Sequence, residues 1–100
     1  GSVIISAVLQ TILNIVDFGM SPMEAVSVPR IHSEGEFVHV EARVESSQIA
    51  VLESFGHKIK KSPYSFDPMM ARCHVILKDK KNWKAGADPR SGGGVAFARV

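Results

Sequence analysis

The sequence predicts a small α+β fold, and three observations support that class. An apolar segment with helical spacing opens the chain, and the residues from Phe37 to Val44 alternate with a period of two. The other expected helices and strands follow one another without a strict strand–helix–strand rhythm. Of the 100 residues, 45% are hydrophobic and 22% charged, as in a globular core. We expect residues 1–100 to form a single domain, either a small protein or a piece of a larger one.

The opening segment predicts one helix from about Ser2 or Ser6 to Phe18. Its apolar residues recur at steps of three and four, at Val8, Leu9, Ile12, Leu13, Ile15 and Val16. The polar residues form one narrow stripe, made of Gln10, Asn14 and Asp17. Gly19 follows as a stop, because glycine takes a positive φ without a Cβ clash. An apolar surface this wide predicts a largely buried helix.

A short second helix is expected next. Ser21 and Glu24 can form a capping box, Pro22 suits the first helical position, and Pro29 disfavours helical geometry just before it. A half-covered strand should then run from Phe37 to Val44. Its apolar face would carry Val38, Val40, Ala42 and Val44, and its polar face His39, Glu41 and Arg43.

A third helix is predicted from Ser46 or Ser47 to a stop at Gly56. Its inner side would carry Ile49, Leu52 and Phe55. The lysine-rich segment from His57 to Lys61 is typical of an edge strand, because lysines oppose further pairing. The proline-containing segment Ser62–Pro68 is expected to be a loop.

The last part of the chain predicts a hairpin and one more strand. A strand over Arg72–Lys78 and its partner over Trp83–Ala87 flank a tight polar turn at residues 79–82. A second turn at residues 88–94 is rich in glycine. Residues 95–100 would form the final strand.

Composition argues against several classes of site. The single cysteine, Cys73, excludes an internal disulfide and a cysteine-rich zinc site. The four histidines lack the spacing of a metal motif, so neither a metal nor a cofactor is expected. A net charge of +2 is too small to indicate a nucleic-acid partner, although the lysine-rich second half leaves a basic nucleic-acid binder as an alternative to be tested.

Several segments together carry a family resemblance. They are GSVIISAVLQTILNIVDFGMSPMEAVSVPRIH, VEARVE, VLESFGHKI and AGADPRSGGGVA. In this order they resemble the C-terminal part of the small subunit of gamma-glutamyltranspeptidase, also called glutathione hydrolase. One departure precedes the strand after the loop, where this chain has Asp67-Pro68-Met69-Met70 and the family usually has a small residue, often glycine.

The resemblance implies an N-terminal-nucleophile hydrolase (αββα) fold and an enzyme that cleaves gamma-glutamyl amides. The glutamyl group passes to water, an amino acid or a peptide, and no cofactor is involved. In that family a self-cleaving precursor exposes a threonine as nucleophile, with its own α-amine as base. This chain lacks that threonine and the residues that hold the glutamyl group. The resemblance therefore implies an isolated chain without activity, partnered by the remainder of its precursor and prone to self-association. The family's compartment is usually periplasmic or extracellular.

The resemblance also singles out a few residues. Gly1 matches the end of a glycine-rich run whose backbone N–H groups form part of an oxyanion hole, although Gly-Ser is also a common remnant of expression tags. Arg30, Asp88 and Arg90 lie in the best-matching motifs and are candidates for a structural role or for precursor processing. The structural interpretation is favoured, because a guanidinium readily ties turns together through its fork of donors. A non-enzymatic protein-interaction module remains the alternative function.

Overall fold

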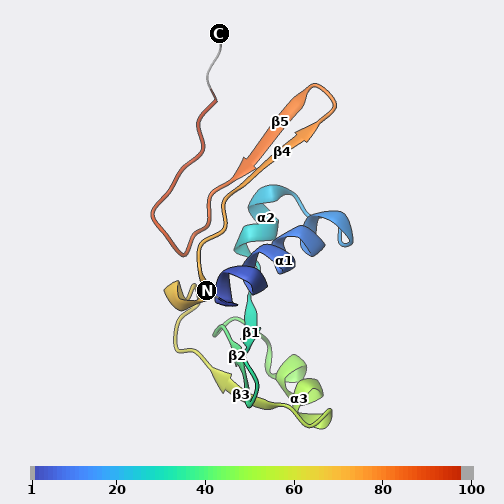
Figure 1. Ribbon diagram of the computed structural model, residues 1–100, viewed down its shortest axis with the longest axis vertical. Helices are drawn as coiled ribbons and strands as arrows, with labels where there is room; N and C mark the ends of the chain where they lie inside the picture. The colour runs from blue at the N-terminus through green and yellow to red at the C-terminus, as the bar shows by residue number, and fades with distance from the viewer. Residues whose placement is uncertain (1, 98–100) are drawn as a thin grey trace.

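The computed structural model describes residues 2–97, which form an elongated molecule with extents of 53 × 26 × 24 Å. Helix α1 (Ser2–Val16) and helix α2 (Pro22–Ser27) lie in the middle. A sheet with helix α3 (Ser46–Ser54) lies at one end, and a hairpin projects at the other (Figure 1). The expected α+β content, with a long first helix, antiparallel strands and two further short helices, is confirmed.

Helix α1 has the expected position, but it turns its polar side inward. The buried residues are Ala7 and Thr11, at 1% and 3% exposure. Gln10 exchanges two hydrogen bonds with the backbone of Ile31, at 2.7 and 3.0 Å. Asn14 donates to the carbonyl of Ala25 at 3.1 Å. The polar stripe is therefore the docking face, because its side chains meet backbone groups that need partners.

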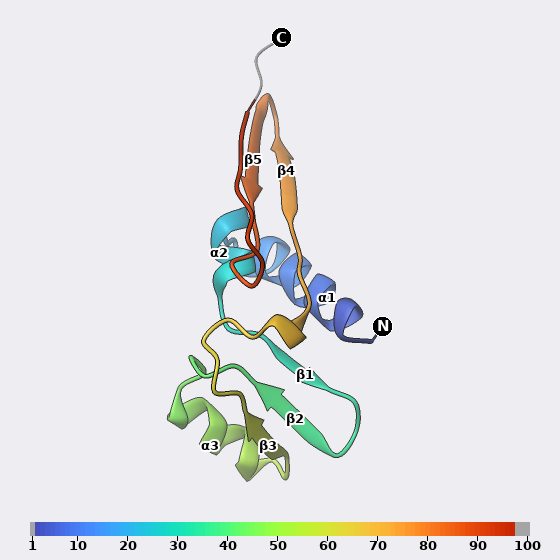
Figure 2. The same cartoon turned by 90° about the vertical axis from the view of Figure 1, so that its left-hand side faces the viewer.

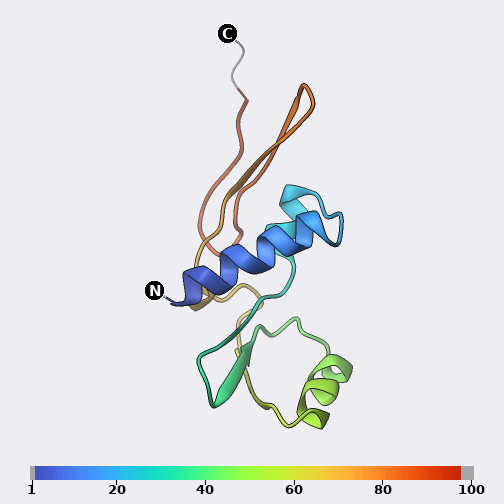
Figure 3. The same cartoon turned by 45° about the vertical axis from the view of Figure 1, so that its right-hand side comes forward.

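The apolar side of α1 is open in these residues, so the prediction of a largely buried helix is wrong for this chain by itself. Its large side chains are between 38% and 72% exposed, namely Ile4, Ile5, Val8, Leu9, Ile12, Leu13 and Val16. Figure 3 shows α1 crossing the front of the molecule with nothing laid over that side. No helix in the described part of the chain is long and apolar enough to cross a membrane.

Helix α2 confirms the predicted capping box. The Ser21 hydroxyl accepts from the N–H of Glu24, and the Glu24 carboxylate accepts from the N–H of Ser21. The helix ends at Ser27, and Val28 before Pro29 is extended with ψ 155°. Gly19 has φ +65°, as its place after α1 predicted.

The three-stranded sheet consists of β1 (Ile31–Ser33), β2 (Phe37–Val40) and β3 (Lys58–Lys61). β1 and β2 are antiparallel, whereas β2 and β3 are parallel because α3 forms the crossover between them (Figure 2). β3 lies at the edge of this sheet, as its lysines predicted. β2 is shorter than expected, since the chain turns after Val40 and places Glu41 in the interior.

Helix α3 ends near Gly56, which has φ +92°. Ile49 and Leu52 are half-buried as expected, but Phe55 is 73% exposed. Phe55 is the residue that ends the helix, so its side chain no longer follows the inner face.

The second sheet is the hairpin of β4 (Val75–Asp79) and β5 (Asn82–Gly86). β4 begins three residues later than predicted, after the short 3₁₀ helix η1 (Pro68–Met70) and Ala71 at φ 65°. The strand expected over 95–100 is absent from residues 95–97, and residues 98–100 lie outside the described part. A Cβ on Gly86 would lie 2.6 Å from the Pro22 backbone, so this glycine lets the hairpin contact α2.

Candidate functional site

Arg30, Asp88 and Arg90, which lie far apart in the sequence, meet in one buried network with Glu41. Asp88 Oδ2 accepts from Arg30 Nη1 at 2.7 Å, and Asp88 Oδ1 accepts from Arg90 Nη1 at 3.1 Å. Glu41 Oε2 accepts from Arg90 Nε at 2.8 Å, and Glu41 Oε1 accepts from Arg90 Nη2. All four residues are at most 5% exposed. Two guanidinium groups thus balance two carboxylates.

Both carboxylates also bind backbone N–H groups. Glu41 accepts from the N–H of Arg30 at 2.8 Å and from the N–H of Asp67 at 2.7 Å. Asp88 accepts from the N–H of Cys73 at 2.8 Å and from that of Arg90 at 2.9 Å. The last bond lies within the turn that the sequence predicts at residues 88–94.

Burial and hydrogen bonding oppose each other in setting the charge of these groups. Burial by itself would raise the pKa of Asp88, but the N–H groups of Arg90 and Cys73 and the guanidinium of Arg30 outweigh it. The pKa of Asp88 therefore lies below its ordinary value. Burial likewise favours a lower pKa for Arg90, yet Glu41 and Asp88 raise it above the ordinary value. Both groups stay charged at neutral pH.

The guanidinium groups extend the network to backbone carbonyls. Arg90 donates to Val26 O at 2.7 Å and to Val28 O at 3.0 Å, which fixes the end of α2. Arg30 donates to Met70 O at 3.3 Å and to Ala71 O at 3.4 Å, which fixes the end of η1. The network therefore joins α2, the end of β2, η1 and the turn after β5.

The network's chemistry is that of a scaffold. Each carboxylate accepts at least four hydrogen bonds or ion-pair contacts, so neither is free to act as base or nucleophile. Within residues 2–97, the one polar atom of the four that is buried without a hydrogen-bond partner is Arg30 Nη2. The arrangement holds four segments in place, and any reacting group must come from elsewhere.

The sequence did not identify Glu41 as a member of the network, and its assignment to the polar face of a strand was wrong. The strand ends one residue earlier, so Glu41 turns into the interior instead of toward solvent. The sequence did hold a signal for Glu41. Arg30 and Arg90 carry two positive charges, whereas Asp88 supplies one negative charge, so two buried arginines would need a second carboxylate as partner. Gly1, the proposed oxyanion-hole residue, lies outside the described residues.

The nucleophile expected for the family is not among the described residues. The sequence has one threonine, Thr11, and it lies in the middle of α1. Its hydroxyl donates to the carbonyl of Ala7 at 2.8 Å, and the residue is 3% exposed. Thr11 has no free α-amine, so it cannot act as a nucleophile activated by its own terminus.

Cys73 and the histidines do not assemble a metal site. Among residues 2–97, no three His, Cys, Asp or Glu side chains are placed to bind one ion. Cys73 is half-buried. The neighbouring His74 accepts from the N–H of Asp88 through Nδ1 at 3.1 Å.

Comparisons with known proteins connect this geometry to a family. The family model described as Gamma-glutamyltranspeptidase matches residues 1–98. The Acylase ACY 1 proenzyme of a Pseudomonas species is 38% identical over 95% of this chain and 18% of its own length. The Glutathione hydrolase-like YwrD proenzyme of Bacillus subtilis is 33% identical over 82% of this chain and 17% of its own length.

Solved structures agree with this assignment. The cephalosporin acylase from Bacillus halodurans matches 94% of this chain with a TM-score of 0.84 and 28% identity, over 18% of its own chain. The gamma-glutamyltranspeptidase from Pseudomonas nitroreducens matches 95% of this chain and 50% of its own, with a TM-score of 0.79. At 18% identity the second likeness bears on the fold only. This chain spans 11–18% of the curated relatives, and it belongs to the gamma-glutamyltranspeptidase family.

Proposed function

We propose that these residues are the C-terminal part of the small subunit of a gamma-glutamyltransferase or glutathione hydrolase. The enzyme would cleave a gamma-glutamyl amide and transfer the glutamyl group to water, an amino acid or a peptide. The observation that carries the proposal is the family match over residues 1–98 in a chain that spans 11–18% of relatives described as proenzymes. The nucleophile would be a threonine outside these residues, so this chain alone should be inactive.

The part played by this chain would be structural support for acyl transfer. Backbone N–H groups at the start of α1 would stabilise the oxygen that becomes negative, an effect of about 3–4 kcal/mol per donor in comparable sites. Arg30 holds the carbonyls at the end of η1, and η1 packs against α1. The buried network would therefore fix the position of η1, and through η1 the position of α1 relative to the rest of the site.

The exposed apolar side of α1 is evidence that this chain packs against a partner. The helix has no charged residue, and its seven exposed apolar side chains form one continuous stripe at positions 4, 5, 8, 9, 12, 13 and 16. Such a stripe is normally covered in a folded protein. We assign its cover to the remainder of the precursor, and expect the isolated chain to self-associate through it.

Complementation tests both points. The purified chain should release no product from a gamma-glutamyl anilide, and adding the separately expressed remainder of its precursor should restore release. Ile12→Asp should abolish restoration, because it puts a charge in the stripe. The matched control is Val51→Asp on α3, since Val51 is 53% exposed and Ile12 is 52% exposed.

The outcomes separate the candidate functions. Activity of the isolated chain would contradict the assignment of the nucleophile to other residues. Association without activity would favour the alternative, a non-enzymatic interaction module. Equal effects of Ile12→Asp and Val51→Asp would contradict the role given to α1. We also propose a periplasmic or extracellular location on the basis of the family resemblance, to be tested by fractionating cells that produce the full-length protein.

A further inference from the structure

A small cavity lies where the first turn of α1 meets the sheet and η1. Its volume is about 170 Å³, and its walls come from four parts of the chain. The lining residues are Val3 from α1, His32 and Glu34 from β1 and the turn after it, His39 from β2, and Asp67, Met69 and Met70 at η1. Two carboxylates and two imidazoles thus share this space with three apolar side chains.

The strand pairing explains why the polar groups of the sheet gather on one side. His32 and His39 are directly opposite each other in the β1–β2 pair, and Glu34 follows His32 by two residues. Residues that are opposite each other, or two apart along a strand, point to the same side of a sheet. Glu34 comes one residue after the end of β1, and its Oε1 lies 3.2 Å from His32 Nε2.

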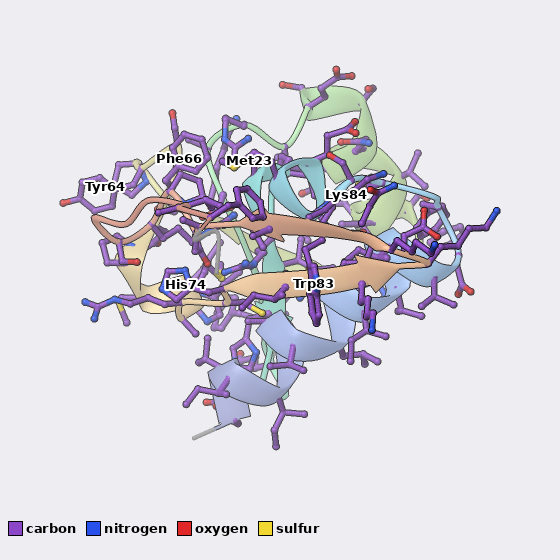
Figure 4. All side chains as sticks on the ribbon, turned by 90° about the horizontal axis from the view of Figure 1, so that it is seen from above. Met23, Tyr64, Phe66, His74, Trp83 and Lys84 are labelled. Carbon is purple, nitrogen blue, oxygen red and sulfur yellow. The ribbon has the colours of Figure 1, made fainter. Side chains whose placement is uncertain are left out.

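Asp67 reaches the same cavity from the loop between β3 and η1. Its backbone N–H donates to Glu41 at 2.7 Å, and its Oδ1 caps η1. The residue before it, Phe66, is held by the guanidinium of Arg43, whose central carbon lies 3.9 Å from the ring centroid. Figure 4 shows Phe66 and Tyr64 of this loop on the same flank of the molecule. These contacts fix Asp67 before any ligand binds.

The negative charge in this cavity has no matching cation in the described part of the chain. Among residues 2–97, no lysine or arginine nitrogen lies within 4 Å of the carboxylate of Glu34 or Asp67. None of the same residues donates a hydrogen bond to Asp67 Oδ2, since the bond from the N–H of Met69 goes to Oδ1. Two carboxylates are therefore left without a positive partner.

The buried ring of His32 is an independent sign of a ligand. The residue is 8% exposed, and its Nδ1 lies 2.7 Å from the hydroxyl of Ser6. Its Nε2 is buried without a hydrogen-bond partner among the residues described, because the contact with Glu34 lacks the geometry of a hydrogen bond. Glu34 lines the cavity and Ser6 does not, so the ring presents Nε2 to it. The tautomer with its proton on Nδ1 donates to Ser6 and leaves Nε2 as an acceptor beside the carboxylates.

These groups suit an ammonium group better than a metal ion. The described residues do not place three of them to bind one metal ion, whose ligand atoms would lie about 2.0–2.6 Å from it. An ammonium group is held at about 2.7–3.2 Å through its N–H donors, and its charge attracts carboxylates over longer distances. The side chains of Val3, Met69 and Met70 would cover the methylene chain that carries it.

We propose that this cavity binds an alkylammonium group on the amine half of the substrate. The inference rests on the proposed function, which places the scissile carbonyl at the start of α1. The cavity reaches that turn at Val3, so a side chain of the amine half can enter it. The enzyme therefore prefers an amine half with a basic side chain over an apolar one of similar length.

Two amides with the same gamma-glutamyl half test this site in the full-length processed enzyme. One is gamma-glutamyl-lysine amide and the other is gamma-glutamyl-norleucine amide, each joined through the α-amine, so that they differ only in the side-chain ammonium. From the release of glutamate, the wild type should have a kcat/KM about threefold to fivefold higher for the lysine compound. Glu34→Gln should bring this ratio close to one, through KM, because the ammonium is bound equally in the ground and transition states.

Glu36→Gln is the matched control and should leave the ratio as it is in the wild type. Glu36 lies two residues from Glu34, pairs with Lys58 at 3.3 Å and does not line the cavity. Asp67→Asn is the second test, since its amide oxygen can still cap η1 while its charge is lost. It should also lower the ratio.

The possible results distinguish the site from its alternatives. A wild type that does not prefer the lysine compound, or a ratio that Glu34→Gln leaves unchanged, would overturn the proposal. The latter result is expected if a basic side chain from the remainder of the precursor already fills the cavity. A wild type that releases no glutamate from either amide would instead contradict the proposed function. The two failures are thereby distinguished.

Discussion

The glutamate that closes the buried network offers the sharpest test of how this part of the molecule is held together. Glu41 is fully buried and accepts four hydrogen bonds, two from the guanidinium of Arg90 and one each from the N–H groups of Arg30 and Asp67. Glu41→Gln keeps the shape of the side chain but removes its charge. It also turns an NH₂ group toward donors that need an acceptor.

The expected cost follows from these contacts. Each buried hydrogen bond to a charged group contributes about 1.5–3 kcal/mol, and breaking a buried ion pair costs about 3–5 kcal/mol. Since Glu41→Gln leaves Arg90 paired with Asp88 only, we expect a loss of about 3–5 kcal/mol in the free energy of unfolding. Glu53→Gln, an exposed change on α3, should stay within about 0.5 kcal/mol of the wild type.

Hydrogen exchange in the full-length protein measures this locally. The backbone N–H groups of Arg30 and Asp67 donate to the Glu41 carboxylate. In Glu41→Gln their protection factors should fall at least about a hundredfold, because every 1.4 kcal/mol of lost stability corresponds to a factor of ten. Urea unfolding gives the global change. The reasoning would be refuted if Glu41→Gln matched Glu53→Gln in both measurements.

Two further predictions concern Asp88, in the buried network, and the backbone strain at Ala71, whose carbonyl accepts a hydrogen bond from Arg30. Because the folded-state pKa of Asp88 lies below its ordinary value, the stability that Asp88 contributes is complete above the unfolded pKa of about 3.9 and is lost as the pH falls through the lower folded value. The stability difference between wild type and Asp88→Asn should therefore be largest near neutral pH and shrink below about pH 4, and a difference independent of pH would contradict this. Ala71 has φ 65° and ψ −174°, a region that favours glycine, so Ala71→Gly should stabilise the protein by about 1 kcal/mol, whereas Gly56→Ala at φ +92° should destabilise it by a similar amount. Urea unfolding of both variants checks the pair, and destabilisation by Ala71→Gly would be evidence against strain at that residue.

Local chemistry made much of the fold predictable. The Ser21–Glu24 capping box, the stops at Gly19 and Gly56, the edge position of β3 and the hairpin after η1 all depend on residues close together in sequence. The boundaries of the strands were predicted less accurately than their existence. β4 starts three residues later than predicted, because the short helix η1 comes before it. Asp67 caps η1, whereas the prolines of this segment had led us to expect only a loop.

The candidate site was less predictable than the fold, because its contacts join residues that lie far apart in the sequence. Arg30, Asp88 and Arg90 could be singled out from their motifs, but that they meet, and that Glu41 completes the set, depends on contacts across up to 58 residues of sequence.

The sequence by itself determined the three α-helices, the capping box of α2 and the stops at Gly19 and Gly56, because these follow from side chains within a few residues of one another. The order of several motifs along the chain indicated the class of fold and the family. Only the tertiary structure decided which side of α1 faces inward and where Glu41 points. Backbone groups at Ile31 and Ala25 needed partners, and Gln10 and Asn14 supplied them. A buried backbone group without a partner is costly, so the polar stripe of α1 turns toward the rest of the chain, and the apolar side is left for the partner proposed above to cover.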